Sequence, residues 1–183
     1  MQMSESHESS NQSSHTEGIL SRAQVRTRVR PPAGIPKIDL PSTFCMFSAD
    51  KDGNLRQWIL INNKFELLKN YDNIHKDRIF CLTVTRDYKY LFSGSCDKTV
   101  KQFDIKKKTL VRNWGKLHEN WVVTMTSSFN RKYLFTGSAD KTLKQWSIKD
   151  KTLYKDYGQI HENHVYQIIV TTNDKWLFSI SHD

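Results

Sequence analysis

The chain has 183 residues, of which 37% are hydrophobic and 26% are charged, and its formal net charge is +9 at pH 7. This size suffices for one or two domains with a buried core. No run of 18 apolar residues occurs, and the first twenty residues lack the basic start and apolar stretch of a secretory signal, so neither a transmembrane helix nor a leader is predicted. We therefore expect a cytoplasmic protein, with the nucleus as the alternative.

Residues 1–37 are dominated by Ser, Gln, Glu and His and match no other part of the chain. Such a segment buries too little apolar surface to offset the entropy of ordering, so a disordered tail is predicted. Its one concentrated basic patch runs from Arg22 to Arg30 and is followed by Pro31 and Pro32. We interpret this patch as a soluble linker in preference to a specific anion contact.

Internal repetition begins near residue 38. His75, His118 and His161 are spaced by 43 residues, and residues 75–117 and 118–160 are identical at 19 of 43 positions without a gap. A fainter unit precedes them, because residues 47–58 resemble residues 133–146. The repetitive part, 38–183, is therefore divided into blade units at about 38–74, 75–117, 118–160 and a shorter 161–183.

Each complete unit contains four short β-strand patterns separated by turn residues. In the third unit the patterns are 122–126, 133–138, 143–148 and 153–157. Four antiparallel strands at a period of about 40–45 residues are typical of propeller blades. Counting about thirteen strands in all, we expect an all-β fold of about three and a quarter four-stranded blades. Its open ends would be covered by the rest of a propeller, from a longer chain or by oligomerisation.

The histidine, the segment Tyr133–Trp146 and their counterparts in the neighbouring units resemble the WD repeat, over about residues 40–183. The resemblance implies a WD-repeat β-propeller. It also implies a buried hydrogen-bond chain in each blade, from a histidine to a second-strand hydroxyl, a turn aspartate and a third-strand tryptophan. The matching residues are His118, Ser138, Asp140 and Trp146, then His75, Ser95 and Asp97, then His161, Ser181 and Asp183. Phe103 occupies the tryptophan position of its unit and has no N–H to donate.

The same serine, histidine and aspartate residues are also the components of a catalytic triad. Because they recur once per blade at equivalent positions, we interpret them as framework and predict that the chain is not an enzyme. The three repeated histidines belong to different blades, so no metal and no cofactor are predicted. Cys45, Cys81 and Cys96 lie in apolar runs and are expected to be reduced thiols.

Function is expected at the third residue after each histidine, which changes class between repeats: Arg78, Trp121 and His164. In WD propellers the matching loop lies where the central channel opens, a usual docking surface. Tryptophan and arginine are residue types that anchor interfaces. The sequence therefore predicts a non-catalytic scaffold that docks other proteins or peptides, although ordinary loop variation would produce the same pattern.

The net charge of +9 supports an alternative function, a basic propeller associated with nucleic acid or a ribonucleoprotein assembly. Residues 1–37 contribute a surplus of two positive charges, and the remainder is spread over the repeats with acids interleaved. A diffuse surplus is more typical of a solvated surface, so this alternative is the less favoured one.

Overall fold

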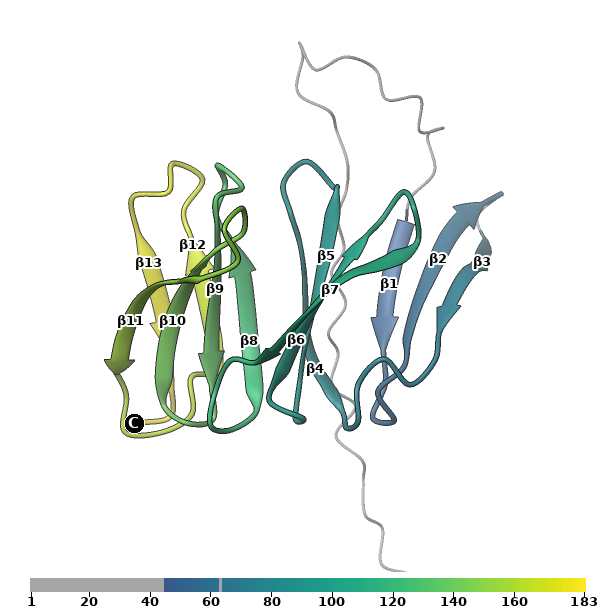
Figure 1. Cartoon of the computed structure of the whole chain (residues 1–183). Helices are drawn as coiled ribbons and strands as arrows, with labels where there is room; N and C mark the ends of the chain where they lie inside the picture. The colour runs from purple at the N-terminus through teal and green to yellow at the C-terminus, as the bar shows by residue number, and fades with distance from the viewer. Residues whose placement is uncertain (1–44, 63) are drawn as a thin grey trace, which may run out of the picture.

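The fold is known from a computed structural model that describes residues 45–62 and 64–183. The tail predicted for residues 1–37 lies outside the described residues. The described part consists of antiparallel β-sheets arranged side by side, and it contains thirteen strands and no helix (Figure 1). The prediction of an all-β fold built from four-stranded antiparallel units is confirmed.

The four sheets follow one another in chain order. The first sheet comprises β1 (Cys45–Ala49), β2 (Leu55–Ile61) and β3 (Lys64–Tyr71). The second comprises β4 (Ile79–Val84), β5 (Tyr90–Ser95), β6 (Thr99–Asp104) and β7 (Thr109–Lys116). The third comprises β8 (Val122–Ser127), β9 (Tyr133–Ser138), β10 (Thr142–Ser147) and β11 (Leu153–Gln159). The fourth comprises β12 (Gln167–Val170) and β13 (Leu177–Ile180).

The turns repeat their backbone conformation from sheet to sheet. Tyr88, Arg131 and Asp174, at equivalent positions, all have positive φ, between 56° and 65°. A left-handed conformation costs a non-glycine residue about 1 kcal/mol. A hydrogen bond across the turn offsets this cost, for example from the Ser128 hydroxyl to Asn130 at 2.8 Å. The polar turn residues therefore set the register of each strand pair.

Neighbouring sheets pack face to face, and their first strands lie next to each other. Strand β8 packs against both β4 and β12, so these three strands form the inner edge of the array. The core lies between sheets. One cluster between the second and third sheets includes Phe92, Val100, Val122 and Leu134, all of them fully or almost fully buried. Each sheet therefore depends on its neighbour to bury its apolar face.

Two groups of turns define the ends of the array. The rim end carries the turns that precede β4, β8 and β12, the β1–β2, β5–β6 and β9–β10 turns, and residues 181–183, and it lies at the bottom of Figure 1. The turn end, at the top of Figure 1, carries the connections 85–89, 105–108, 128–132, 148–152 and 171–176. Cys81 and Cys96 are buried free thiols, and burial raises the pKa of both.

Candidate functional site

A buried hydrogen-bond network ties the histidine of the third sheet to its neighbours. The His118 ring is fully buried, with Nδ1 3.0 Å from Asp140 Oδ2 and Nε2 2.7 Å from Thr136 Oγ1. A carboxylate only accepts hydrogen bonds, so the Nδ1–H donates to Asp140 and Nε2 accepts from the threonine hydroxyl. The indole Nε1–H of Trp146 donates to the same hydroxyl oxygen at 2.9 Å. Each buried side-chain nitrogen and oxygen atom of this network therefore has a hydrogen-bond partner.

The predicted hydroxyl position is wrong by two residues. The Ser138 hydroxyl does not reach the imidazole; it accepts the backbone N–H of Asp140 at 2.9 Å. Ser95 accepts the N–H of Asp97 in the same way, and Ser181 donates to Asp183 at 2.6 Å. The three serines at the predicted position therefore stabilise the turn. The hydroxyls that contact Nε2 of the histidines are those of Ser93, Thr136 and Ser179. The hydroxyls of Thr99 and Thr142 lie 3.1 Å from Nδ1 of His75 and His118.

The other sheets contain partial versions of the network. In the second sheet, His75 lies 2.9 Å from Asp97 and 2.8 Å from Ser93, and Phe103 packs edge-on against Tyr71 with ring centroids 5.4 Å apart. In the fourth, His161 lies 2.6 Å from Asp183, whose side chain is exposed. The first sheet has a pair that was not foreseen, with Trp58 Nε1–H donating to Ser48 at 2.8 Å.

The aspartates of the network are held in their ionised form. Burial opposes ionisation of Asp140, but hydrogen bonds from His118 and Thr142 outweigh it and keep the pKa well below its usual range. Asp97 behaves in the same way through His75 and Thr99, so that its pKa is also strongly lowered. Asp140 additionally accepts the backbone N–H of Glu119 at 2.9 Å. The network therefore fastens the loop that follows each histidine to the neighbouring turn.

The burial of the hydroxyls that contact the imidazoles bears on whether the serine, histidine and aspartate residues could act as a catalytic triad. Ser93 and Thr136, which contact the imidazoles, are fully buried, so their oxygen atoms do not face a cleft from which a substrate could approach. A nucleophile needs such access. Among the described residues there is no group of three or more His, Cys, Asp or Glu that could hold a metal ion. Nor does the described part of the chain contain a helix long and apolar enough to cross a membrane.

The three predicted docking residues occupy one equivalent position on the rim end. Arg78, Trp121 and His164 lie in the loops just before the inner strands β4, β8 and β12, and we call these three residues the rim. The Arg78 carbonyl accepts the N–H of Cys96 at 2.8 Å, and the Trp121 carbonyl accepts that of Ala139 at 3.0 Å.

The residue immediately before each rim residue also accepts a hydrogen bond, through its side-chain oxygen, from the backbone N–H of that rim residue. The acceptors are Asp77, Asn120 and Asn163, at 2.6–2.9 Å. The backbones of Arg78 and Trp121 are therefore held on both sides by hydrogen bonds, and that of His164 through its N–H.

Aromatic side chains lie beside the rim residues. The comparison of the repeats did not identify them as candidates. The Arg78 guanidinium lies 5.9 Å from the centre of the Phe80 ring, and Phe80 lies 5.7 Å from Trp121. Likewise His164 lies 5.7 Å from Tyr166, which lies 4.7 Å from His182. Phe80 follows Arg78 and Tyr166 follows His164 by two positions. Since alternate residues of an extended strand point to the same face, this spacing could have identified both aromatic residues from the sequence. The rim residues therefore belong to two aromatic groups on one end of the fold.

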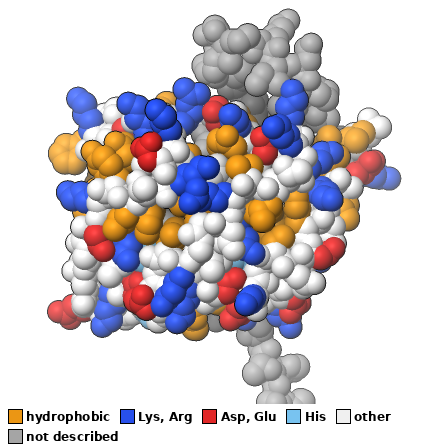
Figure 2. Space-filling model, in the orientation of Figure 1, with side chains coloured by type: hydrophobic (Ala, Val, Ile, Leu, Met, Phe, Trp, Pro, Cys, Tyr) orange, Lys and Arg blue, Asp and Glu red, His pale blue; other side chains and the backbone are white. Residues whose placement is uncertain are grey.

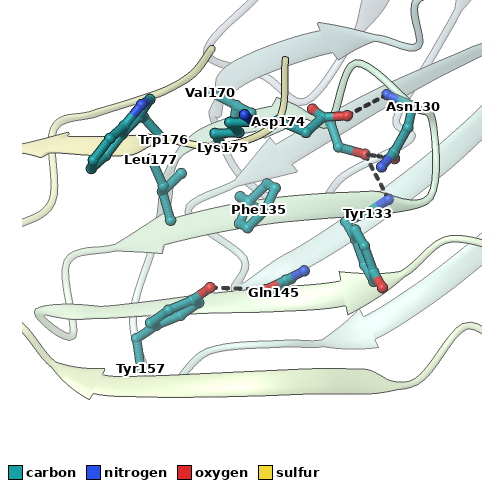
Figure 3. A pocket seen from close by; sticks show the side chains of 11 residues that line it. Asn130, Tyr133, Phe135, Gln145, Tyr157, Val170, Asp174, Lys175, Trp176 and Leu177 are labelled. Atoms are coloured by element: carbon teal, nitrogen blue, oxygen red, sulfur yellow. Dashed lines mark hydrogen bonds between the residues drawn. The ribbon is translucent and has the colours of Figure 1, made fainter. Parts of the chain in front are cut away.

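A small cavity of about 200 Å³ lies between the third sheet and β13, and Figure 3 shows its lining. Several of its polar residues have partners within the chain. Asp174 accepts the N–H groups of Phe129 and Asn130, and the Tyr157 hydroxyl donates to Gln145 at 2.9 Å. We interpret this cavity as a packing feature between sheets and assign it no ligand.

Comparisons with known proteins agree with this architecture. The family model described as "WD domain, G-beta repeat" matches residues 66–104 and 109–147. Two similar solved structures are titled "Structure of U3-55K" and "Crystal structure of RRP9 WD40 repeats". Each is 20% identical to this chain with a TM-score of 0.61, and each alignment covers 68% of this chain. The chain spans 38% of the length of either structure, and the likeness concerns the fold. No curated protein has a matching sequence.

Proposed function

Since this chain belongs to the WD-repeat family, whose domains are scaffolds for protein interactions, we propose that it docks other proteins or peptides at its rim. The observation that carries the proposal is the position of Trp121. Its side chain is 42% exposed although its backbone is hydrogen-bonded on both sides. An exposed tryptophan on a rigid backbone loses little entropy when a partner covers it.

The neighbouring groups indicate what the rim would recognise. Arg78 offers a planar donor fork beside Phe80, which in turn lies beside Trp121, so this part of the rim suits a peptide with an apolar side chain next to a carboxylate. His164 and Tyr166 provide a second contact point of mixed polar and aromatic character. The proposed role uses no chemistry beyond binding, in keeping with the burial of the Ser93 and Thr136 hydroxyls.

Replacement of Trp121 by Ala tests the proposal. Dodecapeptides are selected from a random display library on the immobilised 183-residue chain, and their affinities for variants are then measured. We expect Trp121→Ala to weaken the selected peptides by about 2 kcal/mol, roughly thirtyfold, because truncation removes the central anchor. The melting temperature should change little, since an exposed side chain makes few core contacts.

Leu153→Ala is the matched control, because Leu153 is also exposed and apolar but lies on the outer strand β11. It should leave peptide affinity within about twofold of the unmodified chain. Equal affinities for the unmodified chain and the Trp121, Arg78 and His164 variants would contradict docking at the rim. Loss of binding only in step with loss of folding would also contradict it, because it would make these residues part of the framework.

The proposal also states what packs against the exposed face of β13. This strand is hydrogen-bonded to β12 alone, and Trp176, Phe178 and Ile180 are exposed. The opposite face of the same hairpin is the one that packs against the third sheet, through Val165 and Ile168. In a longer chain further strands would cover the exposed face, and in the isolated 183-residue chain we expect a second copy to do so.

Light scattering measures this association directly. The 183-residue chain should give a mass above that of a monomer at micromolar concentration, and Phe178→Lys should shift it towards the monomer because a charge in the apolar contact is costly. Leu110→Lys, at an equally exposed position on the outer strand β7, should have no such effect. A cooperatively folding monomer of the unmodified chain would overturn the expectation.

A further inference from the structure

The positive charge of the chain is concentrated at the turn end. Its five turns contain ten Lys and Arg residues and three acids, Asp87, Asp150 and Asp174. The ten cations are Arg86, Lys89, Lys106, Lys107, Lys108, Arg131, Lys132, Lys149, Lys151 and Lys175. Figure 2 shows Lys and Arg side chains along this upper end, and others in the middle and at the lower end of the face in view.

The rim end has the opposite balance. Among the described residues, its turns 50–54, 72–78, 96–98, 117–121, 139–141, 160–166 and 181–183 contain five Lys and Arg residues and nine Asp and Glu residues. The two ends of the fold therefore carry charges of opposite sign. A net charge that is diffuse along the sequence becomes polarised in space, since residues 43 positions apart, such as Lys106 and Lys149, meet at the same end.

The cations of the turn end are available for a ligand. Within the described part of the chain, Arg131 is the one member of the ten that has a carboxylate within 4.0 Å, at 3.5 Å from Asp87. Lys106, Lys107 and Lys149 are exposed. A group of cations that outnumbers its acids attracts polyanions and releases their bound cations on contact.

Aromatic rings lie among these cations. A groove of about 250 Å³ is lined by three cations, one carboxylate, one hydroxyl and two tyrosines: Arg131, Lys132, Lys149, Asp150, Ser147, Tyr133 and Tyr154. The two tyrosine rings have centroids 4.7 Å apart, and Tyr154 is 61% exposed. At the same end, Trp176 is exposed and the Arg86 guanidinium stacks 3.6 Å from the centre of the Phe129 ring.

We propose that the turn end binds single-stranded nucleic acid, with phosphates on the exposed lysines and an unpaired base against Tyr154. Exposed rings beside a track of cations are the groups that recognise a single strand, because every base offers a π-face and every nucleotide a phosphate. A duplex hides its bases, and the carboxylates of an acidic polypeptide offer no aromatic face to stack in the groove. This site lies at the end opposite to the rim and does not depend on docking there.

The test measures the anisotropy of labelled 15-nucleotide oligouridine with the full 183-residue chain at 0.1 M salt. The double variant Lys107→Glu with Lys149→Glu should weaken binding by about tenfold or more and make the salt dependence shallower. Lys51→Glu with Lys76→Glu changes two exposed lysines of the rim end and alters the net charge equally, so it is the matched control. It should weaken binding by less than about threefold, because those lysines contact no phosphate.

Stacking is tested separately with Tyr154→Ala. This variant should weaken oligouridine binding by about tenfold and leave binding of a 15-base-pair DNA duplex within about twofold. Tyr166→Ala, at an exposed tyrosine of the rim end, should leave both unchanged. Oligothymidine of the same length shows whether the site distinguishes RNA from DNA; either preference is compatible with a single-strand site.

Three results would overturn the proposal. Equal losses in the two lysine pairs would show that net charge alone attracts the oligonucleotide. Loss of binding in Arg26→Gln with Arg28→Gln and Arg30→Gln, without loss in the lysine variant of the turn end, would assign the binding to the basic segment near the N-terminus. Equal affinity for polyglutamate, together with no effect of Tyr154→Ala, would make the turn end a surface for acidic polypeptides.

Discussion

Asp140→Ala should destabilise the fold by about 3 kcal/mol, because it removes the acceptor of several hydrogen bonds at once. The imidazole Nδ1–H of fully buried His118 would lose its partner at 3.0 Å. The backbone N–H groups of Glu119 and Thr142 would lose theirs at 2.9 and 3.0 Å. Denaturant melts that follow tryptophan fluorescence measure the change in the free energy of unfolding.

Asp52→Ala provides the comparison, since Asp52 is an exposed aspartate in a turn of the first sheet. It should change the free energy of unfolding by less than about 0.5 kcal/mol. If Asp140→Ala were as neutral as this control, the hydrogen-bond network would contribute nothing to stability.

The same network predicts a loss of stability in acid. Asp97 and Asp140 have folded-state pKa values below those of the unfolded chain, where an aspartate titrates near about 4. The unfolded state therefore binds more protons at low pH, and stability is full above about pH 5 and falls as pH drops below about 4. Asp140→Asn keeps an acceptor oxygen but does not titrate, so its stability should depend less on pH in this range.

Gly94→Val should destabilise the fold by about 2–3 kcal/mol, because side chains of the third sheet pack directly against this glycine of the second sheet. A Cβ atom there would lie 2.8 Å from both Cys81 Sγ and Val122 Cγ1 and 3.2 Å from Met125 Cε. The inter-sheet core would have to open to admit a branched side chain. Since this core also includes Phe92 and Leu134, we expect a lower denaturation midpoint and weaker cooperativity.

Gly115→Ala measures the cost of backbone strain at a glycine position separately from the cost of disturbed packing. Gly115 has φ of +72° and nothing lies within 4 Å of a Cβ built there. Its replacement should cost about 1 kcal/mol through conformational strain alone. If Gly94→Val lowered the free energy of unfolding by no more than Gly115→Ala does, that result would contradict tight packing between the sheets.

Strand positions were predictable because the repeats supply several independent examples of one pattern. The predicted patterns at 122–126 and 133–138 correspond to β8 and β9, and the polar residues between them form the turn that joins these strands. The prediction of the network was correct for the pairing of His118 with Asp140 and wrong for the hydroxyl. Thr136 and Ser138 point to the same face of β9 because they are two residues apart, so alternation could not distinguish them.

The sequence by itself determined the repeat period, the all-β architecture and the equivalent positions of Arg78, Trp121 and His164, because local patterning and turn chemistry repeat every 43 residues. Only the tertiary structure decided which hydroxyl meets each imidazole, since that depends on the pairing of β8 with β9. It also decided where the charge lies. Lysines that are separated by acids along the chain are brought to one end by antiparallel strands, and the acids of the opposite turns are brought to the other. The diffuse charge of the sequence thus becomes two surfaces of opposite sign because successive turns of an antiparallel sheet alternate between its ends.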